Sequence, residues 1–432
     1  MAGERFELPL GDVCDIKQGR YLGPGDMSEV KSEQTPIPVI GANGILGYTD
    51  RFSYREPVTL VTCRGSNCGM LQRTKGPTWI SNNAMACPPK KPHDSRYIHY
   101  VLQTTDFGEV ITGSAQPQIT TGHLNTKVVT ITRDPEEQKA IAAVLGALDD
   151  KIELNRRMNA TLEAMARALF QSWFVDFDPV RAKLDGRPPA ALDRVTAALF
   201  PDSFQDSEVG RIPTGWTVRS LGEIIDLGSG VPYEAKFKGD SGLPMITLGC
   251  VSFHDRFQDK GLTYYSGGYK ESHVVKTDDL VVASHDVTQE RKQLGSPAMV
   301  PRWLKGSTIL AATNLYMVRN NSKFPNQYLY QLFRAEGFRQ QMVASAKGTV
   351  ILFISKDSIL RHRLAWPSDE LAARFSTEAE ALYSQYSMNT AQSRTLATLR
   401  DTLLPKLLSG ELSVAATVAK SATVQTGKET RP

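Results

Sequence analysis

The sequence predicts an α+β protein built from two β-rich, mixed α/β domains, each followed by one long helix. Three observations lead to this prediction. The second half of the chain repeats features of the first. Two stretches carry apolar residues at coiled-coil spacing, and the segments before them hold short strand-like runs interrupted by Gly and Pro. We expect the two helices to pack as an antiparallel coiled coil with pseudo-twofold symmetry.

The repeat has a period of about half the molecule, which excludes a solenoid and indicates a duplicated domain. The run FELPLGDV at 6–13 returns as WTVRSLGEI at 216–224, and TWISNNAM at 78–85 returns as TILAATNL at 308–315, where we match Asn83 with Asn314. The predicted order is a first domain at 1–134, a long helix at 135–180, a connector at 181–215 with a short helix at 189–200, a second domain at 216–366, a second long helix at 367–412 and a disordered tail at 413–432.

Both long helices have a start signal and an apolar seam. Asp134 can cap the first helix and Pro135 suits its first turn, while a Pro-Ser-Asp-Glu run at 367–370 opens the second. Seam residues then recur alternately four and three positions apart. They are Ile141, Leu145, Leu148, Ile152, Leu162, Ala166, Leu169 and Trp173 in the first helix, and Phe375, Ala379, Leu382, Tyr386, Asn389, Ser393, Leu396, Leu403 and Leu407 in the second.

Polar residues interrupt both seams near mid-length. Asn155 and Asn159 fill the two positions missing from the first seam, and an offset of 234 carries them to Asn389 and Ser393. If the helices are antiparallel and meet at their midpoints, Asn155 lies near Asn389. A buried Asn pair would select the helix register at a cost in stability. The alternative is that both Asn side chains lie in water at the edge of the seam.

Composition narrows the classes of protein that remain. The 432 residues carry 50 Lys and Arg against 46 Asp and Glu, but residues 216–366 alone hold 19 basic and 13 acidic side chains, a weak indication of a polyanionic partner. No apolar run is long enough for a membrane span, and the N-terminus lacks a signal core. Five sparse cysteines fit a reducing compartment, so we expect a cytoplasmic location. Cys63 and Cys68 have the spacing of half a metal site, but ordinary strand cysteines explain them more simply.

Catalytic signatures are missing from the sequence. It contains no Gly-x4-Gly-Lys-Ser/Thr loop, no Gly-x-Gly-x-x-Gly after a strand, no Asn-Pro-Pro-Tyr or Asp-Pro-Pro-Tyr of amino-methylating enzymes and no Gly-x-Ser-x-Gly. Ser284, His285 and Asp286 resemble a triad only in composition, because adjacent residues of a strand point to opposite faces. We therefore expect a protein without catalytic activity and without a metal or cofactor of its own.

Polar and basic loop residues are the candidate functional groups. In the first domain a strand-like run at 58–63 leads into residues of the type that reads base edges in the DNA major groove, where Arg pairs with guanine and Asn with adenine. A solvated hairpin with Asn in its turns explains the same residues. The candidates here are Arg64, Ser66, Asn67, Arg73, Lys75, Asn82 and Asn83, with Gln116 and Gln118 just before the first helix.

The second domain offers a comparable set, each member of which could also be an ordinary solvated charge. The excess of basic over acidic side chains in this domain favours a contact with nucleic acid. The candidates are Lys236, Lys238, His254, Arg256, His285, Arg291, Lys292 and, just before the second helix, Lys347.

Four segments of the sequence resemble one known family. They are Gly113-Ser-Ala-Gln-Pro-Gln-Ile-Thr, Asp134-Pro-Glu-Glu-Gln-Lys-Ala-Ile-Ala with Leu148-Asp-Asp-Lys-Ile, Gln171-Ser-Trp-Phe-Val-Asp-Phe-Asp-Pro-Val, and Leu403-Leu-Pro-Lys-Leu-Leu-Ser-Gly-Glu-Leu. Together they are similar to the conserved regions of the specificity (S) subunit of type I restriction-modification enzymes, and the likeness covers nearly the whole chain in order. The sequence departs from the pattern at Ala346-Lys-Gly-Thr-Val-Ile, where the second junction lacks Gln-Pro-Gln.

The resemblance implies a non-catalytic reader of double-stranded DNA. Each target-recognition domain would read one half of a split, asymmetric site in the major groove, and the helix pair would fix the spacer between the halves. Two methyltransferase (M) subunits would carry S-adenosylmethionine and methylate adenine. ATP and Mg would be used by motor-nuclease (R) subunits in a full restriction system, and a complex with methyltransferase alone is equally compatible with this sequence.

Four aromatic residues at the end of the first helix exceed what a two-helix seam needs. They could form a docking patch for an M subunit. They could equally pack on the recognition domain of the same chain. A different class of function also remains open, that of a coiled-coil scaffold whose duplicated domains bind protein or glycan. The four residues are Phe170, Trp173, Phe174 and Phe177.

Overall fold

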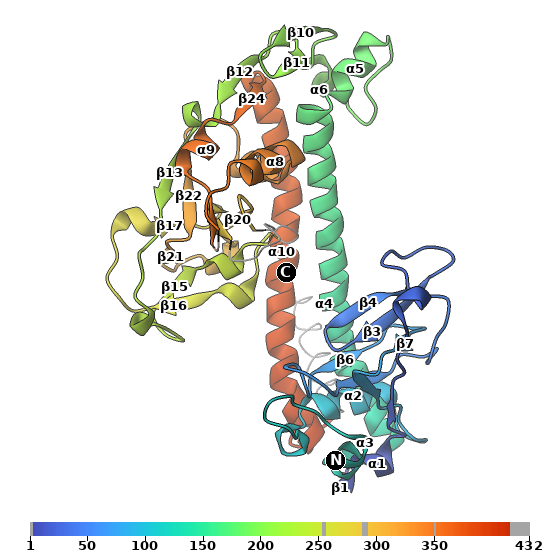
Figure 1. Cartoon of the computed structure of the whole chain (residues 1–432). Coiled ribbons are helices and arrows are strands. Elements are labelled where there is room, and N and C mark those ends of the chain that lie inside the picture. Colours follow the sequence, from blue (N-terminus) through green and yellow to red (C-terminus); the bar gives the residue numbers. More distant parts are fainter. Residues whose placement is uncertain (1–2, 253–255, 287–292, 350, 415–432) are drawn as a thin grey trace, which may run out of the picture. The chain divides into compact units, whose positions relative to one another are not determined.

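The computed structural model describes residues 3–252, 256–286, 293–349 and 351–414 (Figure 1). The chain divides into two compact units. Unit 1 consists of residues 1–154 and 393–432, and unit 2 of residues 155–392. Each long helix therefore contributes one part to each unit.

The described residues of unit 1 form three small sheets. Strand β1 pairs antiparallel with β9, which leads directly into the first long helix. The other two sheets have the strand orders β2-β8-β5-β6 and β4-β3-β7, with β3 and β7 parallel. The strands are β1 Arg5–Pro9, β2 Lys17–Gln18, β3 Ile37–Gly41, β4 Gly44–Thr49, β5 Thr59–Thr62, β6 Leu71–Arg73, β7 Trp79–Ile80, β8 Ala84–Ala86 and β9 Val128–Thr132.

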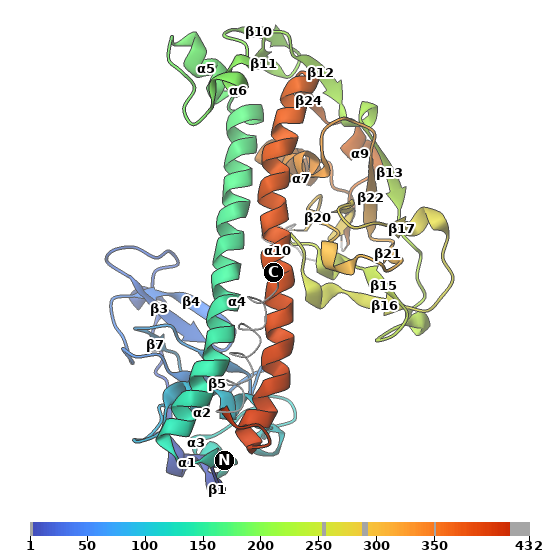
Figure 2. The same ribbon diagram turned by 180° about the vertical axis from the view of Figure 1, so that it is seen from behind.

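Helix α2 connects the sheets of unit 1 to the long helix (Figure 2). Asp94 caps α2 by accepting hydrogen bonds from the backbone N–H groups of Arg96 and Tyr97. Tyr100 of α2 donates to Asp149 at 2.6 Å, and Arg96 pairs with Asp150 at 2.7 Å. The helices of this unit are α1 Leu10–Val13, α2 Ser95–Gln103, α3 Thr121–Thr126 and the start of α4 Pro135–Phe170, with 3₁₀ turns at Pro24–Asp26 and Gly108–Val110.

Unit 2 repeats the strand order of unit 1. Strands β12 and β24 pair antiparallel as β1 and β9 do, and a four-stranded sheet β13-β22-β18-β20 corresponds to β2-β8-β5-β6. Strands β15 and β21 are parallel, like β3 and β7. The strands are β12 Thr217–Ser220, β13 Ile225–Ser229, β14 Lys238–Gly239, β15 Leu243–Ile246, β16 Thr263–Tyr265, β17 Val274–Val275, β18 Leu280–Ala283, β19 His285–Asp286, β20 Pro297–Met299, β21 Ile309–Ala311, β22 Leu315–Asn320, β23 Leu352–Phe353 and β24 Arg363–Trp366.

Helix α7 packs between the sheet of unit 2 and the long helix α10 (Figure 2). Tyr328 of α7 packs edge-on against Phe375 of α10, with ring centroids 5.8 Å apart. The helices are α5 Asp178–Leu184, α6 Arg194–Ala198, α7 Asn326–Arg334, α8 Glu336–Ala344, α9 Lys356–Leu360 and α10 Asp369–Ser409. Short 3₁₀ turns lie at Leu221–Glu223, Ala235–Phe237, Leu248–Cys250, Asp259–Gly261, Glu271–His273 and Arg302–Leu304.

The long helices α4 and α10 run antiparallel within each unit. In unit 1, Arg5 pairs with Glu137 near the start of α4 and donates to the carbonyl of Leu407 near the end of α10. Further along α4, Asp149 pairs with Arg400, which precedes Leu407 on α10. In unit 2, Phe170 at the end of α4 packs on Phe375 near the start of α10. The predicted seam residues are buried or half-buried in both helices.

The predicted proximity of Asn155 and Asn389 is confirmed. Both side chains are buried, and Asn155 Nδ2 donates to the backbone oxygen of Asn389 at 3.3 Å and to Gln392 Oε1 at 2.9 Å. Asn389 Nδ2 in turn donates to Asn159 Oδ1 at 2.9 Å. Asn155 and Asn389 therefore lie inside the helix contact and not at its edge in water.

The prediction that the aromatic residues at the end of α4 form a docking patch on the surface is wrong. Phe170, Trp173 and Phe174 are at most 7% exposed and fill the core of unit 2, where they contact Tyr328 and Phe375. Phe177 is half-buried between Phe204 and Trp216, with its centroid 5.5 Å from the Trp216 ring. The rings pack on the chain's own second domain because its sheet and helices supply the apolar surface that they need to leave water.

The segment between the helix and the second domain is more structured than expected. After α4 a π-helical turn at Gln171–Val175 leads to Phe177, whose left-handed backbone with φ of 55° ends the helix. Helix α5, helix α6 and a hairpin of β10 Phe204–Ser207 with β11 Gly210–Pro213 follow. The predicted tail from 415 onward lies outside the described residues. No helix in the described part of the chain has the length and apolarity needed to cross a membrane.

Candidate nucleic-acid interface

Three loops of the first domain meet at the end of strand β5. Cys63, which follows the strand, donates its N–H to the backbone oxygen of Asn83 at 2.9 Å. The oxygen of Cys63 accepts from the N–H of Ile119 at 3.0 Å. The Asn82–Asn83 turn and the loop at 112–118 therefore lie on either side of the loop that begins at Arg64.

The loop at 112–118, which we call junction loop 1, is closed on itself by backbone hydrogen bonds. Thr112 and Gln118 exchange two N–H to oxygen bonds of 2.8 Å each, and Gly65 donates to the oxygen of Pro117 at 3.0 Å. Gly113 turns the chain with φ of 85°, and a Cβ atom there would lie 2.7 Å from the backbone oxygen of Gln116. Only glycine fits this turn without displacing the backbone.

Junction loop 1 and the Arg64 loop together present polar side chains to solvent. Arg64, Ser66, Gln116 and Gln118 are exposed, while Asn67, Asn82 and Asn83 are half-buried. The structure thus brings together seven of the nine candidates of the first domain. This set supplies both donors and acceptors of the kind that pair with base edges.

Asn43 is a member of this cluster that the sequence interpretation missed. Its Oδ1 accepts from Asn67 Nδ2 at 2.5 Å. Asn43 stands before Gly44 in the turn between β3 and β4, where Gly41 pairs with Gly44. An Asn-Gly pair between apolar runs is a hairpin signal that could have located the turn, although not its approach to Asn67.

Arg73 and Lys75 do not join the cluster, which corrects their assignment. In the antiparallel pair of β5 and β6, Arg73 lies opposite Thr59, at the start of β5, whereas Arg64 follows its end. Arg73 donates to the carbonyl oxygen of Ser95 at 3.1 Å, and burial lowers the pKa of its guanidinium. Lys75 is exposed and pairs with Glu153 on α4. Both cations therefore contact helices at the other end of the strand.

The second domain repeats the backbone arrangement at the end of β18. Ser284 donates its N–H to the backbone oxygen of Asn314 at 3.0 Å and accepts from the N–H of Ile354 at 2.9 Å, as Cys63 does with Asn83 and Ile119. The expected match of Asn83 with Asn314 is thereby confirmed at the level of hydrogen bonds.

A second junction loop, described at residues 347–349 and 351–353, has the same closure as the first. Lys347 and Phe353 exchange two N–H to oxygen bonds of 2.9 Å each. Gly348 has φ of 101°, and a Cβ atom there would lie 2.2 Å from the oxygen of Ile351. His285 and Phe353 pair in the short ladder of β19 and β23. By these contacts His285 stands where the first domain has Arg64.

Lys347 is exposed and takes the place of Thr112 in the closure of the loop. His285 is half-buried, stacks on the Phe353 ring at 6.1 Å between centroids, and has its pKa lowered by burial. These two predicted residues of the second domain are therefore brought together.

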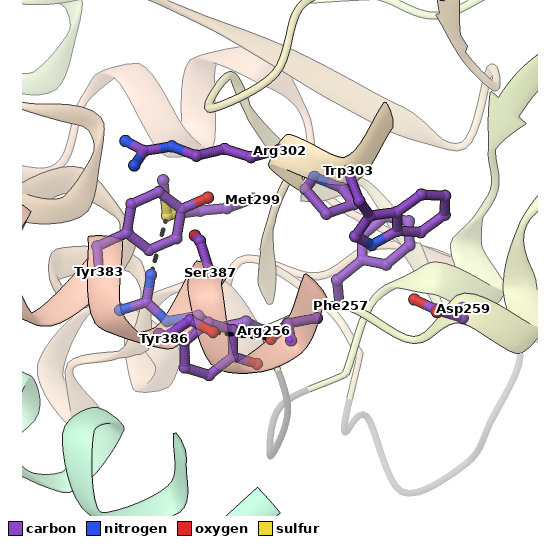
Figure 3. Close-up of a pocket in the computed structure, with 11 residues that line it drawn as sticks. Arg256, Phe257, Asp259, Met299, Arg302, Trp303, Tyr383, Tyr386 and Ser387 are labelled. Carbon is purple, nitrogen blue, oxygen red and sulfur yellow. Dashed lines mark hydrogen bonds between the residues drawn. The ribbon is translucent and has the colours of Figure 1, made fainter. Parts of the chain in front are cut away.

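Arg256 is buried and engaged within unit 2, so its assignment to DNA is wrong. Only 5% of its side chain is exposed, and its guanidinium pairs with the carboxylate of Glu163. Figure 3 shows it beside Tyr383 and Tyr386, with centroid distances of 4.8 and 5.1 Å. A phosphate could reach this cation only by displacing both the carboxylate and the rings.

Two further candidates of the second domain, Lys236 and Lys238, do not join this group. Lys236 and Lys238 are exposed in or beside β14, which belongs to a different sheet from β19. Lys236 pairs with Glu234 at 2.8 Å. His254, Arg291 and Lys292 lie outside the described residues.

The described residues contain no cluster of three or more His, Cys, Asp or Glu side chains placed to hold a metal ion. Burial raises the pKa values of the Cys63 and Cys68 thiols, and a raised pKa disfavours the thiolate form that binds metals. The side chain of Ser284 contacts His285 Nδ1 at 2.8 Å, but the carboxylate of Asp286 accepts from the N–H of Gln293 at 2.7 Å. The geometry of these three residues does not resemble a catalytic triad.

The chain is similar to known proteins that are named as DNA specificity domains or specificity subunits. Residues 6–164 match the family model of the type I restriction modification DNA specificity domain. The chain is 25% identical over 369 residues to the type I restriction enzyme MjaIX specificity subunit of Methanocaldococcus jannaschii, covering 82% of this chain and 78% of that protein. It is 27% identical over 363 residues to the HindI specificity subunit of Haemophilus influenzae, covering 72% and 75%.

A solved structure shares the fold. The S subunit of the type I restriction-modification system from M. genitalium superposes with a TM-score of 0.60 at 15% identity, covering 94% of this chain and 96% of that one. The duplicated domains, the antiparallel helices and the sequence matches agree on one point: residues 6–164 match a type I restriction modification DNA specificity domain, and the chain is similar over most of its length to specificity subunits of type I restriction enzymes.

Proposed function

We propose that each recognition domain reads one half of a split DNA target with its junction loop and the loop after its central strand. The observation that carries this proposal is the repeated backbone arrangement at the ends of β5 and β18, which presents different side chains from the same frame. A constant frame with variable side chains suits two half-sites of different sequence. The target would be read in the major groove, where each base pair has a distinct pattern of donors, acceptors and methyl groups.

The helix pair would set the distance between the two half-sites. Helices α4 and α10 have 36 and 41 residues, and a helix rises about 1.5 Å per residue. The buried contact of Asn155 with Asn389 supports one register of the two helices, because any shift would leave these amides without matching partners. A fixed register would give a fixed spacer.

This chain would act as a non-catalytic subunit of a larger complex. Two M subunits would bring S-adenosylmethionine and transfer its methyl group to adenine, and R subunits, where they exist, would use ATP and Mg. The residues described here would contribute DNA binding and orientation only. Because the aromatic rings at the end of α4 are buried, docking of an M subunit would use other surfaces.

The test is co-expression of the chain with a methyltransferase subunit of its own restriction-modification system, followed by mapping of methylated adenines in the host DNA. We expect one split motif with a single spacer length. A stable complex that methylates adenine without any motif would contradict the assignment of recognition to this chain. Failure to form a complex would instead favour the scaffold function.

A further inference from the structure

The two junction loops present chemically opposite side chains at equivalent positions. Matching the loops by their mutual hydrogen bonds and by Gly113 and Gly348 places Ile351 where the first loop has Gln116. The same match places Phe353 where the first loop has Gln118. The second domain thus carries two apolar side chains where the first carries two amides.

These apolar side chains remain in contact with solvent. Ile351 is 52% exposed and Phe353 is 39% exposed, although they flank Leu352, which is 7% exposed. The ring of Phe353 stacks on the imidazole of His285, with the two ring centroids 6.1 Å apart. Exposed Ile and Phe side chains give this loop an apolar surface where the homologous loop is polar, and contact with a partner would remove that surface from water.

The charge around the loop fits a DNA groove better than a protein surface. Lys347 is exposed at the base of the same loop, and the domain as a whole carries 19 basic against 13 acidic residues. The exposed apolar group on the major-groove edge of DNA is the C5-methyl of thymine, which aliphatic and aromatic side chains recognise by contact. Neither side chain could donate or accept a hydrogen bond from a base.

We propose that Ile351 and Phe353 determine specificity in the second half-site by contacting a thymine C5-methyl group in the major groove. The inference rests on the proposed function of the second domain and adds its chemistry. The second half-site then contains at least one A·T pair that is recognised through its methyl group. The corresponding positions of the first half-site are recognised by the amides of Gln116 and Gln118.

The experiment replaces each thymine of the mapped target with uracil, one at a time and on either strand, and measures binding by the complex with its methyltransferase subunits. Uracil keeps the base pairing and removes only the C5-methyl group. We expect binding to weaken about fourfold at one or two positions, since burying one such group contributes roughly 0.8 kcal/mol. These positions should all lie in one half-site.

Variants assign the effect to the loop. Ile351→Ala and Phe353→Ala should bind the thymine and uracil duplexes with nearly equal affinity at the sensitive position, because each variant removes most of one apolar contact with the methyl group. Gln118→Ala is the matched control in the first domain and should leave the sensitivity to uracil unchanged. The two residues are replaced separately because Phe353 also packs on His285 and Ile351 does not share that contact. Circular dichroism confirms that each variant remains folded.

The outcomes separate this inference from the proposed function. Specific binding to the target with no position sensitive to uracil would overturn the inference and leave DNA recognition intact. The same holds if the sensitivity survives in both loop variants. Equal binding to the target and to a scrambled duplex would contradict the proposed function itself.

Discussion

Glu163 on α4 forms an ion pair with Arg334 on α7, and only 2% of the Arg334 side chain is exposed. The same carboxylate pairs with Arg256, which lies under three tyrosine rings. One acidic residue of the long helix therefore holds two buried cations of the second domain. This contact joins the recognition domain to the helix within unit 2.

Replacing Glu163 by Gln should destabilise unit 2. Two guanidinium groups would lose their shared anion in a site from which water is largely excluded, and breaking such a buried pair costs about 3–5 kcal/mol. The unfolding free energy from urea denaturation measures the loss. Glu136→Gln is the control, because Glu136 pairs with Lys139 in a contact that is more than 60% exposed, where the expected change is below about 1 kcal/mol. Equal effects of the two substitutions would contradict the role given to Glu163.

Asn389→Ala should destabilise the helix pair by about 1–3 kcal/mol, because Asn159 and Gln385 would lose a hydrogen-bond partner inside the contact. Thermal unfolding of the purified chain gives the measurement. The neighbouring Met388 is 59% exposed, so that Met388→Ala is a matched control on the same turn and should change stability little. A comparable loss from both variants would contradict a specific role for the hydrogen bonds of Asn389.

Arg64→Ala should relax one half-site. If the guanidinium pairs with a base edge, discrimination at one position falls by about 1–3 kcal/mol while the other half-site is unaffected. Methylation mapping of the variant complex reveals the relaxed position. Arg187→Ala serves as the control, since Arg187 is an exposed cation that pairs with Asp185 outside both junction loops. A uniform loss on all sequences would identify Arg64 as a phosphate contact.

Matched insertions of seven residues in α4 and α10 should lengthen the spacer of the target without changing either half-site. Seven residues are two turns and preserve the seam, and they add about 10 Å of helix. At 3.4 Å per base pair the spacer should grow by about three base pairs. A variant complex that methylates the original target with its original spacer would rule out the helix pair as the ruler.

The stability of unit 1 should decrease in acid through His99. Burial lowers the pKa of this imidazole from 6.5 to about 4, and the nearby Arg73 acts in the same direction. Because the folded pKa is below the unfolded one, the stabilisation is complete above pH 6.5 and is lost as the pH falls toward 4. His99→Gln should remove part of this dependence, roughly 1–3 kcal/mol between pH 6.5 and 4. Parallel stability profiles for the two proteins would show that His99 does not contribute.

The sequence by itself determined the parts of this protein that depend on local periodicity and on the internal repeat. The alternation of four and three residues located the long helices, because a helix face is fixed by spacing alone. The offset of 234 between the two seams matches Asn155 with Asn389. Antiparallel helices that are related by a pseudo-twofold axis and meet at their midpoints bring such equivalent positions together. The hydrogen bond between them confirms that argument.

Only the tertiary structure determined the contacts of the side chains that the sequence predicts to lie on the surface. From the sequence, a basic residue such as Arg256 is a candidate DNA contact. Its pairing with Glu163, 93 positions away, follows only from the fold. The aromatic end of α4 could have faced a partner or its own domain, and the core of unit 2 supplies the surface. The match of Ile351 with Gln116 likewise cannot be found from the sequence. Backbone hydrogen bonds keep the loop conformation the same in both domains, while the side chains of the two loops differ.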